Sequence, residues 1–236
     1  MMKLKKLCFL LLLTLGCLFS DVYAGSDSTL SKLAISELQQ KAEQGNVQAQ
    51  YLLGRRYLEA KGVERDHEKG YFWIKKAADK NNADAQYDIA SDYENQRDIN
   101  NALIWYKKSA HNGNTTAMFS LGALYRAGMY GIAEDNQEAF KWFNMAAEKG
   151  DSSAQGRIAY LYLNGYGVQR NIPLALELFE KSANNGSPDS AEYLSLLYVR
   201  GEGVGIKPDE KIAEKWALKA KENKDKFLKE LNSRYE

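Results

Sequence analysis

The sequence is poor in the residues that carry out covalent chemistry or bind metals. Of its 236 residues only 2 are cysteine and 2 are histidine, and both cysteines, Cys8 and Cys17, precede Ala24. Cleavage of the chain after Ala24 would exclude disulfides and thiol catalysis. Neither His67 nor His111 has a Cys, a His or paired acidic residues at metal-ligand spacing, and no phosphate-binding loop, dinucleotide fingerprint or nucleophile elbow appears. We therefore expect no metal, no cofactor, no catalytic residue and no enzymatic activity.

Long apolar runs are absent after the N-terminus. Residues 3–6 include three lysines, residues 7–15 are nearly all apolar, and residues 22–24 have small or modest side chains where a signal peptidase reads them. Residues 1–24 therefore resemble a cleaved signal peptide, because the apolar run is shorter than the ~20 residues of a membrane span. We expect a periplasmic or secreted protein with no membrane span after cleavage. The alternative is a lipid anchor at Cys17, since the residues before it resemble a lipobox with threonine in place of the usual leucine.

Neither sign of charge is in excess. The chain has 32 Lys and Arg residues against 31 Asp and Glu residues. Removal of residues 1–24 takes away three lysines and Asp21, which leaves a net charge of −1. Because a balanced charge does not attract polyanions, we expect no nucleic acid and no anionic membrane surface as a partner.

An internal repeat dominates the rest of the sequence. Small residues recur at steps of 36, 32, 37 and 36 residues, at Ala49, Ala85, Ala117, Ala154 and Ser190. Four residues later stand Leu53, Ile89, Leu121, Ile158 and Leu194; five later, Gly54, Ala90, Gly122, Ala159 and Ser195; eight later, Tyr57, Tyr93, Tyr125, Tyr162 and Tyr198. Offsets of 0, 4, 5 and 8 share one helical face, so these columns predict the buried face of a helix, named helix A.

A second set of columns predicts a partner, helix B. Its first column holds the large residues Trp73, Trp105, Trp142, Leu178 and Trp216. Three residues before each of them stands a small one, in order Gly70, Ala102, Ala139, Ala175 and Ala213. The residue directly after each is again apolar, in order Ile74, Tyr106, Phe143, Phe179 and Ala217. Large beside small residues favour close helix packing. The helix is predicted to end at Gly45, Asn81, Gly113, Gly150 and Gly186, residue types that adopt the left-handed conformation. The second repeat is shorter, which predicts a tighter turn between its two helices.

The pattern from Ala154 to Gly186 resembles the Sel1-like repeat, a relative of the tetratricopeptide repeat, although Leu178 occupies its Trp position. The resemblance implies an exported bacterial protein with an all-α fold, a right-handed solenoid of five helix-turn-helix repeats that displays a groove to partner proteins. We expect an N-terminal capping half-repeat at residues 25–45 and the solenoid at residues 46–236. A charged helix from Asp209 onward is expected to cap its end.

The groove of such a solenoid is the predicted binding surface. Helix A offsets 2, 6 and 10 point away from its packed face. Offset 2 holds Tyr51, Tyr87, Phe119, Gly156 and Glu192; offset 6 holds Arg55, Ser91, Ala123, Tyr160 and Leu196; offset 10 holds Glu59, Asn95, Ala127, Asn164 and Arg200. The candidate partner-binding residues, chosen for contact area or forked hydrogen bonds, are Tyr51, Arg55, Tyr87, Phe119, Tyr160 and Arg200. Alternatively, Tyr51, Tyr87 and Phe119 pack against the adjoining repeat.

These observations predict an interaction scaffold whose partner is another protein. Family resemblance implies a role in envelope assembly, exopolysaccharide export, host interaction or toxin neutralisation. The alternative is an envelope hydrolase or a peptidoglycan- or β-lactam-binding protein, because some cysteine-rich Sel1-type proteins bind or slowly cleave penicillins. Those relatives have a disulfide in each repeat, which this sequence lacks.

Overall fold

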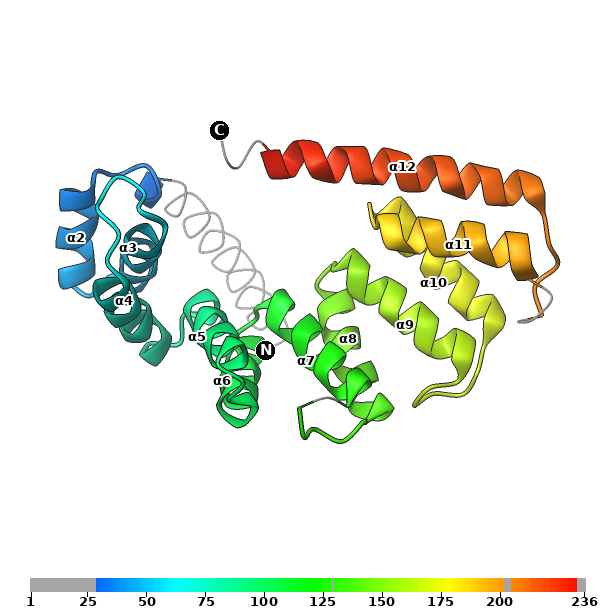
Figure 1. Cartoon of the computed structure of the whole chain (residues 1–236), viewed down its shortest axis with the longest axis horizontal. Helices are drawn as coiled ribbons and strands as arrows, with labels where there is room; N and C mark the ends of the chain where they lie inside the picture. The colour runs from blue at the N-terminus through cyan, green and yellow to red at the C-terminus, as the bar shows by residue number, and fades with distance from the viewer. Residues whose placement is uncertain (1–28, 129, 202–204, 233–236) are drawn as a thin grey trace, which may run out of the picture. The chain divides into compact units, whose positions relative to one another are not determined.

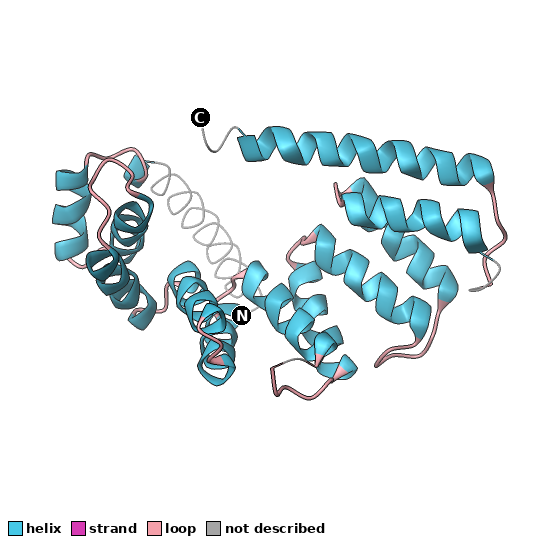
Figure 2. Ribbon diagram, viewed as in Figure 1, coloured by secondary structure: helices cyan, strands magenta, loops and turns pink. Residues whose placement is uncertain are grey.

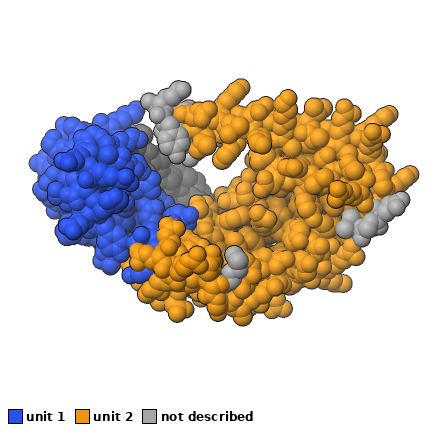
Figure 3. All heavy atoms as spheres, in the orientation of Figure 1, with its two compact units in different colours: residues 1–93 blue, residues 94–236 orange. Residues whose placement is uncertain are grey.

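The computed structural model describes residues 29–128, 130–201 and 205–232. The predicted signal peptide and the alternative anchor at Cys17 lie outside these ranges. Within them all regular secondary structure is helical (Figures 1 and 2), which confirms the predicted fold class. No helix in these ranges is both long enough and apolar enough to cross a membrane. The chain divides into two compact units, residues 1–93 and residues 94–236 (Figure 3).

The helices alternate between the A and B types along the chain. Unit 1 contains α2 (Ile35–Glu43), α3 (Val47–Glu59), α4 (His67–Asp79) and most of α5 (Ala83–Asn95). Unit 2 contains α6 (Ile99–His111), α7 (Thr115–Ala127), α8 (Asn136–Glu148), α9 (Ser152–Asn164), α10 (Ile172–Asn184), α11 (Pro188–Arg200) and α12 (Glu210–Asn232). Within the units each helix A packs on the helix B that follows it, as α3 on α4, α7 on α8, α9 on α10 and α11 on α12.

Most residues of the predicted columns are buried in the core of the two units, whereas Tyr93, Trp105, Tyr125, Tyr162, Leu178 and Tyr198 are half-buried. The four column alanines of helix A are 0% exposed, and Ser190 is 3% exposed. The small residues let helices approach closely, since a Cβ atom added to Gly54 would lie 2.8 Å from the carbonyl oxygen of Gly70. Ala217, by contrast, is exposed and Ser195 only half-buried. Both belong to the last repeat, where no further repeat within the described residues covers them.

Helix B ends as predicted. Gly45, Asn81, Gly113, Gly150 and Gly186 have φ angles of 91°, 64°, 100°, 92° and 99°. The next residue caps the following helix A, its side-chain oxygen accepting a hydrogen bond from a backbone N–H in the first turn. These caps are Asn46, Asn82, Asn114, Asp151 and Ser187. Polar residues thus fix the chain direction between repeats, a role that the sequence analysis did not assign to them.

The tyrosine column fixes the loop from helix A to helix B. The Tyr125 and Tyr162 carbonyls each accept a hydrogen bond of 2.9 Å from the backbone N–H of the residue that caps the next helix, Asp135 or Asn171. In the second repeat only residues 96–98 separate α5 from α6, with φ of 62° at Arg97. The predicted tight turn is therefore confirmed.

Candidate protein-binding site

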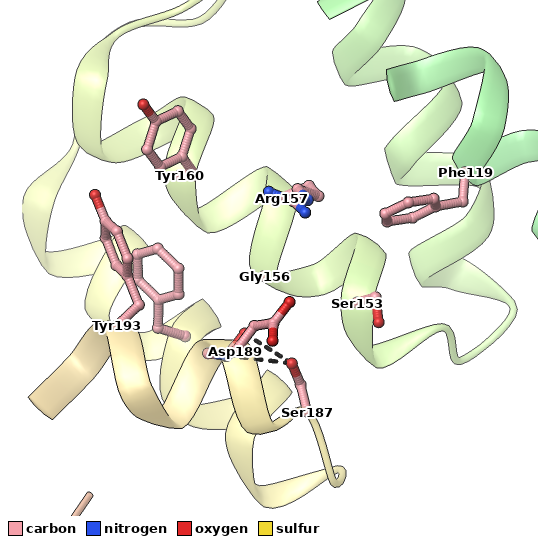
Figure 4. Close-up of a pocket in the computed structure, with 10 residues that line it drawn as sticks. Phe119, Ser153, Gly156, Arg157, Tyr160, Ser187, Asp189 and Tyr193 are labelled. Carbon is pink, nitrogen blue, oxygen red and sulfur yellow. Dashed lines mark hydrogen bonds between the residues drawn. The ribbon is translucent and has the colours of Figure 1, made fainter. Parts of the chain in front are cut away.

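Two of the predicted binding residues, Phe119 and Tyr160, line one pocket in unit 2 (Figure 4). The pocket has a volume of about 180 Å³ and is formed by α7, α9, α10 and α11. The remaining lining residues are Ser153, Gly156, Arg157, Phe179, Ser187, Asp189, Ser190 and Tyr193. The structure therefore brings side chains from three consecutive repeats to one place, although they are far apart in the sequence.

Aromatic rings form much of the pocket wall. The Tyr160 and Tyr193 rings lie 5.9 Å apart in an edge-to-face arrangement, and Tyr193 lies 4.9 Å from the buried Phe179 ring. Burial raises the pKa of the Tyr193 phenol, and the neighbouring Tyr160 and Tyr166 hydroxyls raise it further. The phenol is therefore neutral at physiological pH. This wall offers ring faces and edges, which favour contact with another aromatic group.

Two opposite charges border the same pocket. Arg157 comes from α9 and places its guanidinium carbon 5.9 Å from the centre of the Phe119 ring. Asp189 comes from the first turn of α11. Both side chains are exposed, and neither forms an ion pair within the part of the chain that the structure describes. Their charges remain available to a partner.

A chain of serine hydroxyls closes the base of the pocket. Ser187 Oγ donates to Ser190 Oγ at 3.2 Å, the Ser190 and Ser182 hydroxyls are 2.6 Å apart, and Ser182 Oγ donates to the Ser152 carbonyl at 2.6 Å. A Cβ atom added to Gly156 would collide with Ser190 Oγ, so glycine allows α9 and α11 to approach here. Since these hydroxyls are hydrogen-bonded to one another and to the Ser152 carbonyl, they hold the helices together at the base of the pocket.

A cation lies beside the aromatic wall. The guanidinium carbon of Arg126 lies 4.6 Å from the Tyr166 ring centre and 6.0 Å from that of Tyr160. Its Nη1 atom pairs with Glu134 at 3.3 Å, while its buried Nε atom has no hydrogen-bond partner among the residues that the structure describes. Tyr166 is itself exposed. The aromatic surface thus continues from the pocket to the loop that follows α9.

Three other predicted residues lie in unit 1. Arg55 donates to Asp88 of α5 at 3.2 Å and to Glu59 of its own helix at 2.8 Å. Burial raises the pKa of Asp88, an effect that the Arg55 charge opposes, and burial also raises the pKa of the half-buried Tyr51. Tyr87, beside Asp88 in the sequence, is half-buried. Arg55, Tyr51 and Asp88 therefore form a contact between adjacent repeats, and the Arg55 charge is already engaged.

The sixth predicted residue, Arg200, is exposed at the end of α11 and is not among the residues that line the pocket. Sequence reasoning missed Arg157, Asp189 and Tyr193. Taking helix A at 100° per residue, offsets −1 and 3 fall at about 260° and 300°, beside offsets 6 and 10 at about 240° and 280°. Asp189 therefore lies within the angular range already considered, and a window wider by about 20° would have included Arg157 and Tyr193. In the described residues no three His, Cys, Asp or Glu side chains are grouped to hold a metal ion.

The structure is that of an α-helical repeat protein. Its paired helices repeat at a nearly constant interval, and one pocket is lined by residues from several repeats. The chain belongs to the Sel1 repeat family, whose model matches residues 47–82, 83–114, 115–151, 152–187 and 188–225. Proteins of this family generally mediate protein–protein interactions. The resemblance drawn from the sequence is therefore confirmed.

Solved structures share this fold. A Sel1 repeat protein from Oxalobacter formigenes is 28% identical, with a TM-score of 0.71 over 80% of this chain and 78% of that chain. A protective antigen present in uropathogenic Escherichia coli strains is 33% identical, with a TM-score of 0.73 over 80% of this chain and 41% of that chain.

Among curated proteins, the chain is similar to the HRD3B component of an ERAD-associated E3 ubiquitin-protein ligase from Arabidopsis thaliana. The two are 39% identical over 85 residues, which are 36% of this chain and 13% of that protein. The match thus covers only a small part of the plant protein.

Proposed function

We propose that this protein is an exported interaction scaffold that holds a partner protein at the unit 2 pocket. The observation that carries the proposal is the convergence of Phe119, Arg157, Tyr160 and Tyr193 from consecutive repeats on one pocket. Aromatic and arginine side chains are the types most often found as energetic anchors of protein interfaces. The serine hydroxyls at the base are hydrogen-bonded to one another and connect α9, α10 and α11 around the pocket.

A capture experiment tests the binding function. The mature protein, beginning at Gly25, is immobilised and exposed to a cell-envelope extract, and retained proteins are identified by mass spectrometry. The proposal expects one partner to be retained by the wild type and lost from a Tyr160→Ala/Tyr193→Ala double variant. Exchange of the exposed Ile104 for alanine provides a control outside the pocket. Equal retention by all three proteins would exclude the pocket as the binding site.

Export is tested separately by the intact mass of the protein recovered from the envelope fraction. Cleavage after Ala24 predicts a chain that begins at Gly25 and contains no cysteine. A mass that corresponds to a diacylglyceride-bearing chain beginning at Cys17 would instead establish the lipoprotein alternative. An unprocessed chain in the cell interior would contradict export.

A further inference from the structure

The unit 2 pocket lies where a column of aromatic residues is interrupted. The second position after each column residue of helix A holds Tyr51, Tyr87 and Phe119 in the first three repeats. In the fourth repeat the same position is Gly156, which supplies no ring and lines the pocket instead. The fourth repeat is therefore the first in the chain without an aromatic side chain at this position.

Phe119 shows what a ring at this position does within unit 2. It packs edge-to-face on Phe143 with the ring centres 5.4 Å apart, and the guanidinium of Arg157 from the next repeat lies 5.9 Å from it. Gly156 makes no such contact toward α11. The Ser190 hydroxyl of α11 lies against Gly156, and the pocket remains between Phe119, Tyr160 and Tyr193 (Figure 4).

We propose that the pocket receives an aromatic side chain presented by a polypeptide segment of the partner protein, which packs against Phe119, Tyr160 and Tyr193. This inference rests on the proposed function and adds the chemistry by which the partner is recognised. The ligand class is a peptide segment with an exposed Phe, Tyr or Trp.

The size of the pocket matches a single side chain. Its volume of about 180 Å³ is below the roughly 300–1,000 Å³ of sites that enclose drug-sized ligands. A buried anchor that fills a small pocket at the centre of an interface is a common source of binding energy. The pocket therefore suits one inserted residue of a larger partner better than an independent small molecule.

The walls select an aromatic residue over other side chains. Ring pairs prefer edge-to-face or offset stacking, and Tyr160, Tyr193 and Phe119 together present both faces and edges. Arg157 can approach the face of an inserted ring as it already approaches that of Phe119. The inserted ring would thus make contacts of a kind that this surface already contains.

The charges of the pocket do not favour an ionic side chain. Arg157 and Asp189 carry opposite charges on the same rim, so a cationic and an anionic side chain would each meet one attractive and one repulsive group. Burial raises the pKa of the Tyr193 phenol, so this part of the wall is neutral. An uncharged ring avoids the desolvation cost of burying a charge.

Selection of peptides tests the inference on the mature full-length protein. A library of random twelve-residue peptides displayed on phage is selected on the wild type. We expect the enriched peptides to share one aromatic residue, and its exchange for alanine to weaken binding at least about tenfold, as for an interface anchor.

Two variants block the pocket in different ways. Gly156→Phe/Ser190→Ala reproduces, one repeat further along the chain, the combination of Phe119 in the third repeat with Ala154 in the fourth, and it removes the Ser190 hydroxyl, the atom nearest to a Cβ added at Gly156. Ser153→Phe adds a ring at an exposed lining residue without touching the Ser182–Ser190 hydrogen bond. Both variants should bind the selected peptides at least about tenfold more weakly, while Ile104→Ala should bind them like the wild type. Unchanged unfolding midpoints show that the fold is intact.

Three results would overturn the inference. They are enriched peptides that share charged residues and no aromatic residue, aromatic peptides that bind Ser153→Phe as tightly as the wild type, and no enrichment on the wild type. In each case a captured partner that still depends on Tyr160 and Tyr193 would leave the proposed function standing. A captured partner whose binding is unchanged in the Tyr160→Ala/Tyr193→Ala variant would instead contradict the proposed function.

Discussion

At the scale of the residue, the repeat columns predict which side chains are buried. They do not predict which side chains of adjacent repeats contact each other. Arg55 was predicted from its offset to face a partner, and the structure places it between Asp88 and Glu59. Asp88 lies 33 residues further along the chain. A helical period locates Arg55 on a face, but it cannot show which side chain of the next repeat lies opposite. The contact therefore required the structure.

Trp142 tests the core columns most directly. It is 7% exposed, and its ring packs edge-to-face on His111 with the ring centres 5.7 Å apart. Trp142→Ala is expected to lower the free energy of unfolding by ~3–5 kcal/mol, because it leaves a large cavity. Arg200→Ala, at an exposed position, should change it by less than about 0.5 kcal/mol. Urea unfolding that ranked these two variants in the opposite order would show that the columns are misassigned.

The contact between Arg55 and Asp88 predicts a change in titration. Burial raises the pKa of Asp88 above its ordinary value of 3.8, and the Arg55 charge opposes that rise. Arg55→Gln should therefore raise the pKa of Asp88 further, as measured by NMR titration of its carboxyl carbon. Because a raised pKa means that the folded state binds the proton more tightly, the contribution of Asp88 to stability falls as pH rises from 3.8 through the folded-state pKa. An unchanged or lower pKa in the variant would refute the contact.

At the scale of the element, the sequence predicts the type of each helix and the residues that end it. The left-handed residues at the ends of helix B are where the repeat places them. The sequence predicted fewer of the residues on the groove face of helix A, because only three offsets were considered. Arg157 and Tyr193 both stand at offset 3, on the edge of that face. Which exposed positions converge on one pocket depends on the close approach of α9 and α11 at Gly156, which periodicity does not reveal.

Capping residues predict a measurable contribution from single hydrogen bonds at helix starts. Asp151 Oδ1 accepts from the backbone N–H of Ala154 at 2.7 Å, and the acidic group also lies at the positive end of α9. Asp151→Ala should therefore lower the free energy of unfolding by about 0.5–2 kcal/mol. Asp151→Ser, which keeps a capping oxygen, should recover most of that loss in the same thermal or urea experiment. Equal losses in both variants would mean that the cap does not stabilise α9.

At the scale of the whole molecule, the repeat predicts a binding protein but not its partner. Core columns are constrained by packing and hence repeat, whereas residues that meet a partner differ from one repeat to the next. Phe119 and Tyr160 share the unit 2 pocket, Tyr51 and Arg55 contact each other in unit 1, and Arg200 stands outside the pocket.

The most direct test of the central claim compares two exposed arginines of unit 2. Arg157 lines the pocket and Arg200 does not. Because neither is in the core, their exchange for alanine should leave the unfolding midpoint unchanged. The measurement is the dissociation constant of the captured partner for the wild type and for each variant. We expect Arg157→Ala to raise it about tenfold or more and Arg200→Ala to leave it within about twofold. An unchanged constant for Arg157→Ala, with a large rise for Arg200→Ala, would contradict the claim that the partner binds at this pocket.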